Sequence, residues 1–413
     1  MAQNIILNEC QQREVDGAVN HILKGRTDPY EIAGGPGTGK SVVLNKIREY
    51  LGFGTQQIAP MAFIGQAAIV MRLKGFENAK TFHSWLYTPE MRTKIDKTTK
   101  EVVMDTYLGI PDQELTFIPK DDSLRYKKVA FVDEGYMVPM TLRMELEKYC
   151  IPTVVTGDPN QLPPIGDKPG YLFDTSRMHF LTQVMRQNEN SGIVYLANRA
   201  LAGLPINPGW YGDALVIYED QLTNDMIASS DIVLCGTNKT RDSINHTVRS
   251  QILGYHSDVP QYYEKVICRS NDWKTEIDGI GLANGLIGRV MSPPEPSMFS
   301  NDRKIFYMDF MPDLFNGVFN RIDVDYDYFV APCGEKQRIK MRRFQQGHCF
   351  DFAYCITTHL AQGGEYPRVL YIEEELNSDI QNKINFVAIT RAKEGLIYVK
   401  KRYRKYYNFT NQR

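Results

Sequence analysis

Eight consecutive residues near the N-terminus, Gly34 to Ser41, have the types and spacing needed to hold a chain of phosphates. They fit the pattern G-x-x-x-x-G-K-[ST], with Lys40 and Ser41 at its end. Glycines let successive backbone N–H groups turn toward phosphate oxygens, and a following helix adds the positive end of its dipole. Lys40 is expected to reach the β- and γ-phosphates, and the Ser41 hydroxyl to ligate Mg²⁺.

The residues around this loop predict the strand and helix that it needs. Residues 30–33 fit the end of a short strand, and apolar residues recur at helical spacing after the loop. A chance glycine-rich loop is the alternative, but it does not account for this context. We therefore predict nucleoside triphosphate binding by Gly35, Pro36, Gly37, Thr38, Gly39, Lys40 and Ser41.

Two carboxylates follow a second apolar run. Residues 128–132 predict a buried strand, and Asp133 and Glu134 come directly after it. Asp133 suits the binding of Mg²⁺ through its water shell, and Glu134 suits the orientation and deprotonation of an attacking water. Acidic pairs are common in surface loops, so it is the position after a phosphate-binding loop that favours catalysis.

A third apolar run, at residues 153–156, is followed by Gly157-Asp158-Pro159-Asn160-Gln161-Leu162-Pro163-Pro164. An amide side chain at a strand end can hydrogen-bond both a γ-phosphate and the attacking water. Gln161 is therefore a candidate γ-phosphate sensor. The alternative is a proline-rich turn that only ends the strand.

Composition describes an ordinary soluble chain of several domains. Its 413 residues are 43% hydrophobic and 23% charged. The seven cysteines form no C-x-x-C pair, so we expect neither a zinc site nor a disulfide framework, and reduced thiols in a cytoplasm. No signal peptide or membrane span is expected. A net charge of −1 gives no support to nucleic-acid binding unless basic groups gather locally, as at 125–128, 340–343 and 400–405.

Strand-like runs alternate with helical patterns along most of the chain, which favours parallel sheets covered by helices. Two regions break the alternation. Residues 86–125 are polar and predict an inserted hairpin, and residues 260–344 predict a small β-rich insertion.

The order of these motifs resembles that of superfamily 1 helicases, with residues 157–164 as motif III. The resemblance runs from residue 7 to 399 outside the insertions and is closest to the RecD/Dda-type branch, which includes small phage helicases. It implies an α/β fold with two RecA-like parallel-sheet domains in tandem, one with a hairpin-like and one with an SH3-like insertion. The expected boundaries are 1–85 with 126–180, 86–125, 181–259 with 345–413, and 260–344.

The resemblance implies ATP and Mg²⁺ as cofactors and adds residues to the site. Gln11 takes the place of the adenine-reading glutamine, Arg186 and Arg391 of two arginine fingers, and Gln362 and Gly363 of motif V nucleotide contacts. The expected catalytic set is then Lys40, Glu134, Gln161, Arg186 and Arg391. Because the arginines belong to the second domain, ATP is expected to bridge both domains, so that hydrolysis moves them.

The resemblance also implies contacts with a nucleic-acid backbone by Pro60, Thr81, His83, Thr237, Asn238, Thr358 and His359. Each has a structural alternative: a histidine often serves as a hydrogen-bonding residue of the core, and Thr and Asn often cap helices. Aromatic residues are candidates for base stacking or strand separation, or belong to the core. These are Phe63, Phe82, Trp85 and Tyr107.

The function implied by the resemblance is an ATP-dependent DNA helicase that travels 5′→3′ on single-stranded DNA and opens forked DNA. It implies a monomer in the cytoplasm of a bacterial or phage-infected host, with a single-strand-binding or replication protein as a candidate partner. Two alternatives stay open. One is an RNA helicase of the same superfamily, because 2′-OH contacts cannot be placed from sequence. The other is a nucleotide-switched remodelling ATPase that does not unwind.

Overall fold

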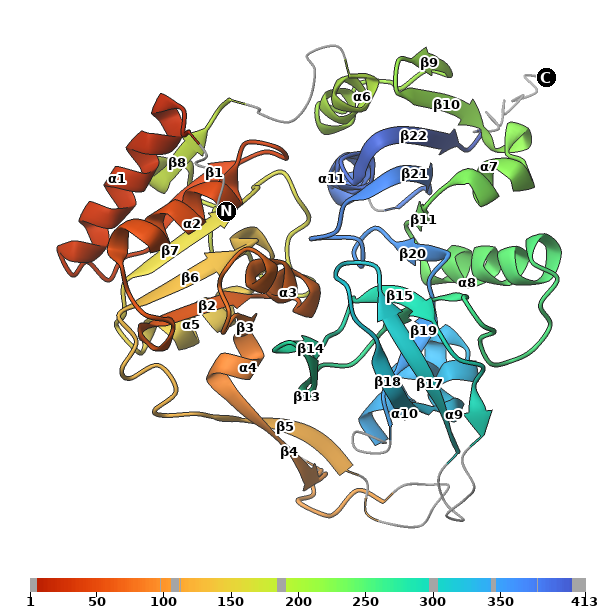
Figure 1. Cartoon of the computed structure of the whole chain (residues 1–413), viewed down its shortest axis with the longest axis horizontal. Helices are drawn as coiled ribbons and strands as arrows, with labels where there is room; N and C mark the ends of the chain where they lie inside the picture. Colours follow the sequence, from red (N-terminus) through yellow and green to blue (C-terminus); the bar gives the residue numbers. More distant parts are fainter. Residues whose placement is uncertain are drawn as a thin grey trace, which may run out of the picture. The chain divides into compact units, whose positions relative to one another are not determined.

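The structure is a computed structural model that describes residues 6–96, 98–104, 111, 113–183, 191–296, 304–342, 347–376 and 378–402. Its contacts divide the chain into two compact units (Figure 1). Unit 1 comprises Met1–Gln187 and Tyr255–Ala353, and unit 2 comprises Asn188–Gly254 and Tyr354–Arg413. The chain of unit 2 is therefore interrupted by a segment that packs with unit 1.

A sheet of six parallel strands forms the centre of unit 1, in the order β3-β2-β6-β7-β1-β8. Its strands are β1 (Tyr30–Gly34), β2 (Ile58–Ala62), β3 (Lys80–Thr81), β6 (Val129–Asp133), β7 (Thr153–Gly157) and β8 (Met178–Leu181). Every residue of β1, β2, β6 and β7 is buried. Strands covered on both faces are expected to be almost continuously apolar, as these are.

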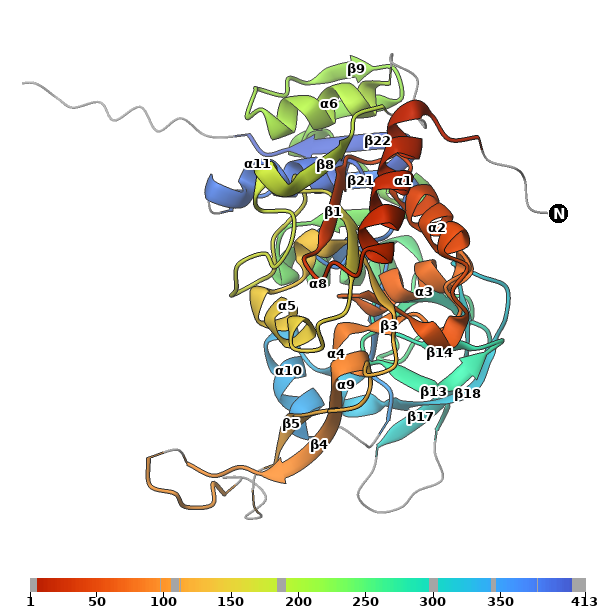
Figure 2. The ribbon, with the colours of Figure 1, turned by 90° about the vertical axis from the view of Figure 1, so that its left-hand side faces the viewer.

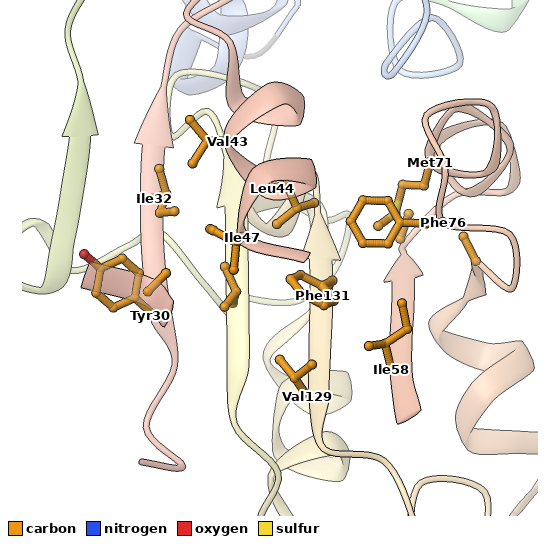
Figure 3. Close-up of a cluster of buried hydrophobic side chains, with 14 of the residues drawn as sticks. Tyr30, Ile32, Val43, Leu44, Ile47, Ile58, Met71, Phe76, Val129 and Phe131 are labelled. Carbon is orange, nitrogen blue, oxygen red and sulfur yellow. The ribbon is translucent and has the colours of Figure 1, made fainter. Parts of the chain in front are cut away.

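Helices cover both faces of this sheet. On one face, α1 (Glu9–Leu23), α2 (Lys40–Leu51) and α3 (Gly65–Leu73) enclose a cluster of buried apolar side chains. Figure 3 shows Leu44 and Ile47 of α2 above Phe131 of β6, and Figure 2 shows α1 and α2 side by side. On the other face, α4 (Phe82–Leu86) and α5 (Met140–Glu147) pack in a second cluster.

The strand order decides which loops meet. Strand β7 lies between β1 and β6, with Ala33 opposite Gly157 and Val132 opposite Val155. Because the carboxyl ends of parallel strands share one edge of a sheet, the loops after β1, β7 and β6 are neighbours there. The phosphate-binding loop, Gln161 and Asp133 are thus brought to the same edge.

A long hairpin leaves the sheet after α4 (Figure 1). Strands β4 (Tyr87–Thr93) and β5 (Gln113–Pro119) are antiparallel, paired from Tyr87↔Pro119 to Thr93↔Gln113. The hairpin expected within residues 86–125 is therefore present. Residues 105–110 and 112, and with them Tyr107, lie outside the described residues.

The segment 255–353 forms a small antiparallel β structure in unit 1. Its elements are β12 (Lys265–Cys268), β13 (Asp272–Ile277), β14 (Ile280–Leu282), β15 (Ile287–Val290), β16 (Glu295–Pro296), β17 (Ile305–Pro312), β18 (Phe319–Asp325), β19 (Phe350–Phe352), α9 (Tyr326–Val330) and α10 (Cys333–Arg342). It packs on α3, where Ile69 joins its core and the Arg72 guanidinium lies 5.0 Å from the Trp273 ring centroid. The β-rich insertion expected at 260–344 thus belongs, by its contacts, with the first parallel sheet.

Unit 2 contains the second sheet, in the order β20-β11-β21-β22-β10-β9, parallel except for β9. Its elements are β9 (Gly209–Tyr211), β10 (Ala214–Tyr218), β11 (Ile232–Cys235), β20 (Cys355–Thr357), β21 (Tyr366–Ile372), β22 (Ala392–Lys400), α6 (Gly192–Leu201), α7 (Asn224–Ser229), α8 (Asn238–Thr247) and α11 (Ser378–Ile389). The predicted α/β class with two parallel sheets in tandem is confirmed. No helix in the described part of the chain is long and apolar enough to cross a membrane.

Candidate functional site

The phosphate-binding loop joins β1 to α2 through a backbone that only glycine adopts easily. Gly37 and Gly39 have φ values of +76° and +86°, in the left-handed region. A Cβ on Gly39 would also lie 2.4 Å from Nε2 of Gln11. A Cβ on Gly35 would meet no atom within 4 Å. The loop is therefore tight on the side of α1 and open at Gly35, as a cradle for phosphate requires.

Lys40 lies against the loop that it was predicted to serve. Its Nζ donates hydrogen bonds to the carbonyl oxygens of Gly34 and Gly35, at 2.8 and 3.0 Å. The Thr38 hydroxyl donates to the same Gly35 carbonyl at 2.9 Å. Phosphate oxygens are stronger acceptors than carbonyls because they are charged, so the ammonium group can exchange one set for the other.

Gln11 fastens α1 to this loop. Its Nε2 donates to the Thr38 carbonyl at 3.1 Å, and its Oε1 accepts from the Asn8 backbone at 3.1 Å. The Asn8 side chain accepts from the Gln11 backbone in return, which completes a capping box at the start of α1. This positioning role was not predicted, although Asn-x-x-Gln before an apolar run is its sequence signal. Adenine reading by Gln11 stays a prediction.

Asp133 ends β6 with its side chain mostly buried and its Oδ1 occupied. That oxygen accepts from the Thr156 hydroxyl at 2.7 Å and from the Glu134 backbone at 3.0 Å. Its Oδ2 accepts no hydrogen bond from any described residue and is left for a cation or its water. The hydroxyl of Ser41 is a second hard oxygen ligand and accepts from Lys74 Nζ at 2.8 Å. This donor set fits Mg²⁺. Thr156 and Lys74 were not predicted.

Glu134 adopts an uncommon backbone conformation. Its φ is +53°, in the left-handed region, where few residues other than glycine are found. Backbone strain of this kind clusters at functional sites, because it aims a side chain that an ordinary strand end would point elsewhere. The turn that follows also packs tightly, since a Cβ on Gly135 would lie 2.2 Å from Val155 Cγ1 of β7. The conformation is compatible with the predicted role of Glu134.

Gln161 gives the clearest indication that a ligand binds at the carboxyl edge of the first sheet. The residue is 3% exposed, and no described residue forms a hydrogen bond with its Oε1. Leaving such a buried group unpaired costs about 1–3 kcal/mol. Buried groups left unpaired in a folded protein call for an explanation, and a ligand is one of the few available. A γ-phosphate or its attacking water would complete this bond.

Nucleotide contacts predicted for the second RecA-like domain show a different environment. Arg186 lies outside the described residues. Arg391 is buried, and its guanidinium donates to the carbonyls of Gly364 at 3.0 Å and Val387 at 3.1 Å. Gln362 is buried, and Gly363 has a φ of +76°. Arg391 therefore joins two predicted motifs inside unit 2, and the nucleotide contacts of these residues stay predictions.

Thr237 is held by a carboxylate that sequence reasoning missed. It caps α8 by accepting from the Thr240 backbone at 3.3 Å, and its hydroxyl donates to Glu374 Oε1 at 2.9 Å. The other oxygen of Glu374 accepts from the backbones of Gly236 and Thr237 at 2.6 and 2.7 Å. The Thr237 hydroxyl is fully used in this arrangement, whereas Asn238 is exposed.

The two predicted nucleic-acid contacts of motif V, Thr358 and His359, differ in their exposure. Thr358 is 0% exposed, and its backbone and hydroxyl both donate to the Cys235 carbonyl, at 2.8 and 3.1 Å. The Thr358 side chain is therefore buried, and its hydroxyl hydrogen is donated in the bond that joins the end of β20 to β11. His359 is partly exposed, and burial lowers its pKa, so the imidazole is neutral at pH 7.

Two residues of unit 1 that were predicted to contact nucleic acid are buried. Pro60 is buried in the middle of β2, and its carbonyl accepts from the Trp85 indole at 2.8 Å. The strand continues two residues beyond it, and contact of Pro60 with DNA stays a prediction. Thr81 is also buried and caps α4 through the Ser84 backbone at 3.2 Å. Phe82 and Trp85 belong to the core.

His83 opens instead into an aromatic pocket of about 530 Å³ at the root of the hairpin. The ring centroid of Phe117 lies 5.3 Å from that of His83, and Phe63 and Tyr87 line the same space. Burial lowers the pKa of His83, so its ring is neutral at pH 7. Neutral aromatic faces in an open pocket suit base stacking. Phe63 was predicted as a stacking candidate, but Phe117 was not, because only the pairing of β5 with β4 brings it here.

Comparisons with known proteins agree on the fold. Residues 17–167 match a family model described as an AAA domain. A structure of two coordinating Pif1 helicases at forked double-stranded DNA has a TM-score of 0.56 and 15% identity, covering 95% of this chain and 92% of that one. Pif1 helicase from Candida albicans has a TM-score of 0.54 and 17% identity, covering 96% and 94%.

A third structure, of Pif1 helicase from Bacteroides with ADP-AlF3 and single-stranded DNA, has a TM-score of 0.53 and 14% identity, covering 96% and 92%. At such identities a likeness shows the fold. The chain therefore has the fold of the Pif1 helicases, with the tandem RecA-like domains that its resemblance to superfamily 1 helicases predicted.

Proposed function

We propose that this chain is an ATP-dependent DNA helicase that moves on single-stranded DNA and separates the strands of a fork. One observation carries the hydrolytic part. Lys40, Asp133 and the unpaired Oε1 of Gln161 follow three adjacent strands at one edge of the first sheet. The fold likeness to helicases solved with single-stranded and forked DNA supports the choice of track.

The proposed chemistry assigns one task to each group. Glu134 takes a proton from the attacking water, whose oxygen bonds to the γ-phosphorus while the bond to the bridging oxygen of ADP breaks. Gln161 Oε1 orients that water, and Lys40 stabilises the charge on the phosphate oxygens. Ser41 and Asp133 would hold Mg²⁺, which neutralises phosphate charge. Arg186 and Arg391 remain the proposed arginine fingers.

The proposed track runs over features that can bind bases and phosphates. The aromatic pocket at His83 and Phe117 would stack a base, and the exposed Asn238 would meet the backbone. Travel from 5′ to 3′, a monomeric motor and a single-strand-binding or replication protein as partner are proposed from the family resemblance alone.

The first test is ATP hydrolysis with and without nucleic acid. We expect single-stranded DNA to raise the rate by about tenfold or more, because track and nucleotide binding are coupled. Single-stranded RNA and blunt duplex serve as matched controls. Stronger stimulation by RNA would favour the RNA helicase alternative, and no stimulation by any of them would favour the nucleotide-switched ATPase.

The second test separates movement from hydrolysis. Duplexes with either a 5′ or a 3′ single-stranded tail are offered with ATP, and strand release is followed by fluorescence. Release from the 5′-tailed duplex alone is expected. Release from the 3′-tailed duplex alone would reverse the proposed polarity, and hydrolysis without release from either would contradict unwinding.

A further inference from the structure

Three lysines gather at the root of the hairpin, apart from the residues that line the aromatic pocket. Lys80 begins β3, Lys120 follows β5, and Lys127 precedes β6. We call these three residues the lysine cluster. They lie far apart in sequence, and only Lys127 belongs to a basic run that the sequence displays. The next lysine of that run, Lys128, lies instead over the Phe53 ring, 4.9 Å from its centroid.

Contacts with backbone and rings hold these charges in place. The ammonium groups of Lys80 and Lys127 lie 5.7 and 5.2 Å from the same Trp85 ring centroid. Lys127 Nζ also donates to the Gln56 carbonyl at 2.6 Å, and Lys120 Nζ donates to the Ser84 carbonyl at 2.8 Å. A lysine on an open surface is free to turn into solvent, but these side chains are fixed on one ring and its neighbours.

The charges in the lysine cluster are not neutralised from within. No carboxylate among the described residues forms an ion pair with any of its three lysines. Burial, and then the charge of Lys80, lower the pKa values of Lys120 and Lys127. Nearby Asp121 and Asp122 are exposed, and Asp122 pairs with Arg125 at 3.2 Å. Fixed cations that repel one another are stabilised by an anion from outside.

An exposed aromatic residue beside the cluster narrows the kind of anion. Tyr126 is 80% exposed and directly precedes Lys127 and Lys128. The Arg125 guanidinium lies 5.9 Å from its ring centroid. Phosphate-binding lysines next to an open aromatic face are the combination that holds single-stranded nucleic acid, which carries phosphates and unpaired bases together.

We propose that the lysine cluster and Tyr126 bind the displaced strand of a fork. The inference rests on the proposed helicase function. The hairpin root then carries two binding surfaces: the aromatic pocket for the strand on which the motor travels, and the lysine cluster for the strand that it leaves. A grip on the displaced strand opposes reannealing behind the point of separation.

The test compares two DNA substrates and two variants. Affinities are measured by fluorescence anisotropy for a fork with both tails and for the same duplex without the displaced tail. The double variant Lys80→Gln/Lys127→Gln removes the two charges over the Trp85 ring and leaves the Nζ bond of Lys120 intact. The matched control, Lys24→Gln/Lys168→Gln, removes two exposed charges of unit 1 outside the cluster.

We expect the wild-type chain and the control to bind the full fork about tenfold more tightly at low salt than the duplex without the displaced tail. The double variant should lose most of this difference, and the salt dependence of its fork binding should fall by about 1.4 in log–log slope. Its affinity for single-stranded DNA should not change. Tyr126→Ala should also reduce the difference, and Tyr126→Phe should retain it.

Three outcomes would overturn the inference: no fork preference in the wild-type chain, an equal loss in the control, or an equal loss on single-stranded DNA alone. The last would place the cluster on the travelled strand. Stimulation of ATP hydrolysis by single-stranded DNA, measured on the same preparations, tests the proposed function separately. Loss of that stimulation with an intact fork preference would contradict the motor and not the cluster.

Discussion

The carboxyl edges of the two parallel sheets treat their polar groups in opposite ways. At the edge of unit 1, the Oε1 of Gln161 has no partner among the described residues, and Glu134 adopts a left-handed conformation. At the edge of unit 2, the hydroxyls of Thr237 and Thr358 are both engaged within the unit. The first edge therefore holds a buried polar atom without a partner among the described residues, whereas the two buried hydroxyls of the second edge are already hydrogen-bonded.

The two sheets share a parallel topology, but their carboxyl edges differ in how their polar groups are used. Unpaired buried groups and strained backbone lower the stability of the fold, and they persist where ligand binding compensates for that loss. At the unit 2 edge, polar groups hold the loop at Gly236 by hydrogen bonds, so that the exposed Asn238 has a defined position. We expect substitutions at the first edge to change catalysis more than stability, and substitutions at the second to change stability and DNA binding together.

The largest effect is expected for Glu134→Gln. Loss of the proposed base should lower kcat by about 10²–10⁴-fold. The dissociation constant for ATP should change by no more than about threefold, because the residue acts on the attacking water. Single-turnover hydrolysis and fluorescent nucleotide titration measure the two quantities. Near-normal turnover would remove Glu134 from the chemistry.

Gln161→Leu should separate catalysis from stability. The variant removes a buried, unpaired amide, so the free energy of unfolding should stay the same or rise by about 1 kcal/mol, while kcat falls by about 10²-fold. Gln66→Leu is a matched control, because Gln66 Oε1 is also buried without a partner among the described residues. It should show a similar stability and an unchanged basal rate. A destabilised Gln161→Leu would break the contrast between the edges.

Glu374→Gln tests the hydrogen-bonded edge of unit 2. It should lower the free energy of unfolding by about 1–3 kcal/mol, because one carboxylate bonds two backbone groups and two hydroxyls. The DNA concentration for half-maximal stimulation should rise by about tenfold, with basal hydrolysis unchanged. The exposed Glu375→Gln is the control. An unchanged DNA requirement would show that Glu374 does not position the Thr237 loop.

The same carboxylate predicts a pH dependence. Burial raises the pKa of Glu374, but hydrogen bonds from Thr240, Thr237 and Gly236 outweigh it and hold the pKa below the ordinary 4.5. A depressed pKa contributes stability that is fully present above the unfolded value and is lost as the pH falls through the folded value. Acid unfolding of the wild-type chain should show this loss below pH 4.5. The loss should be smaller in the Glu374→Gln variant, in which other carboxylates with a lowered pKa, such as Asp272, still contribute.

The smallest effect is expected for Thr358→Val. The hydroxyl is buried on the Cys235 carbonyl, so its loss should lower the free energy of unfolding by about 1 kcal/mol. The DNA concentration for half-maximal stimulation should stay within about twofold of the wild-type value. Thr357→Val at the neighbouring position controls for strand propensity. A large rise in the DNA requirement for Thr358→Val alone would indicate that this hydroxyl contacts the DNA backbone.

Most of the nucleotide edge could be predicted because its motifs are contiguous. A loop of eight residues, an acidic pair and an amide after apolar runs each carry their own local signal. The partners of these residues could not be predicted in the same way. Thr156 and Lys74 reach Asp133 and Ser41 from other elements, and nothing local marks them. The burial of Pro60 within β2 could not be predicted either, because a motif gives the order of residues and not the depth of a strand.

The sequence by itself determined the phosphate-binding loop and the two parallel sheets, because glycine conformation and apolar periodicity are local properties. Only the tertiary structure decided which strands are neighbours, and therefore that Gln161 falls between Lys40 and Asp133. It also gathered the lysine cluster around Trp85 and closed Glu374 onto Thr237. Such contacts depend on strand order and side-chain burial, which join residues that no spacing in the chain relates.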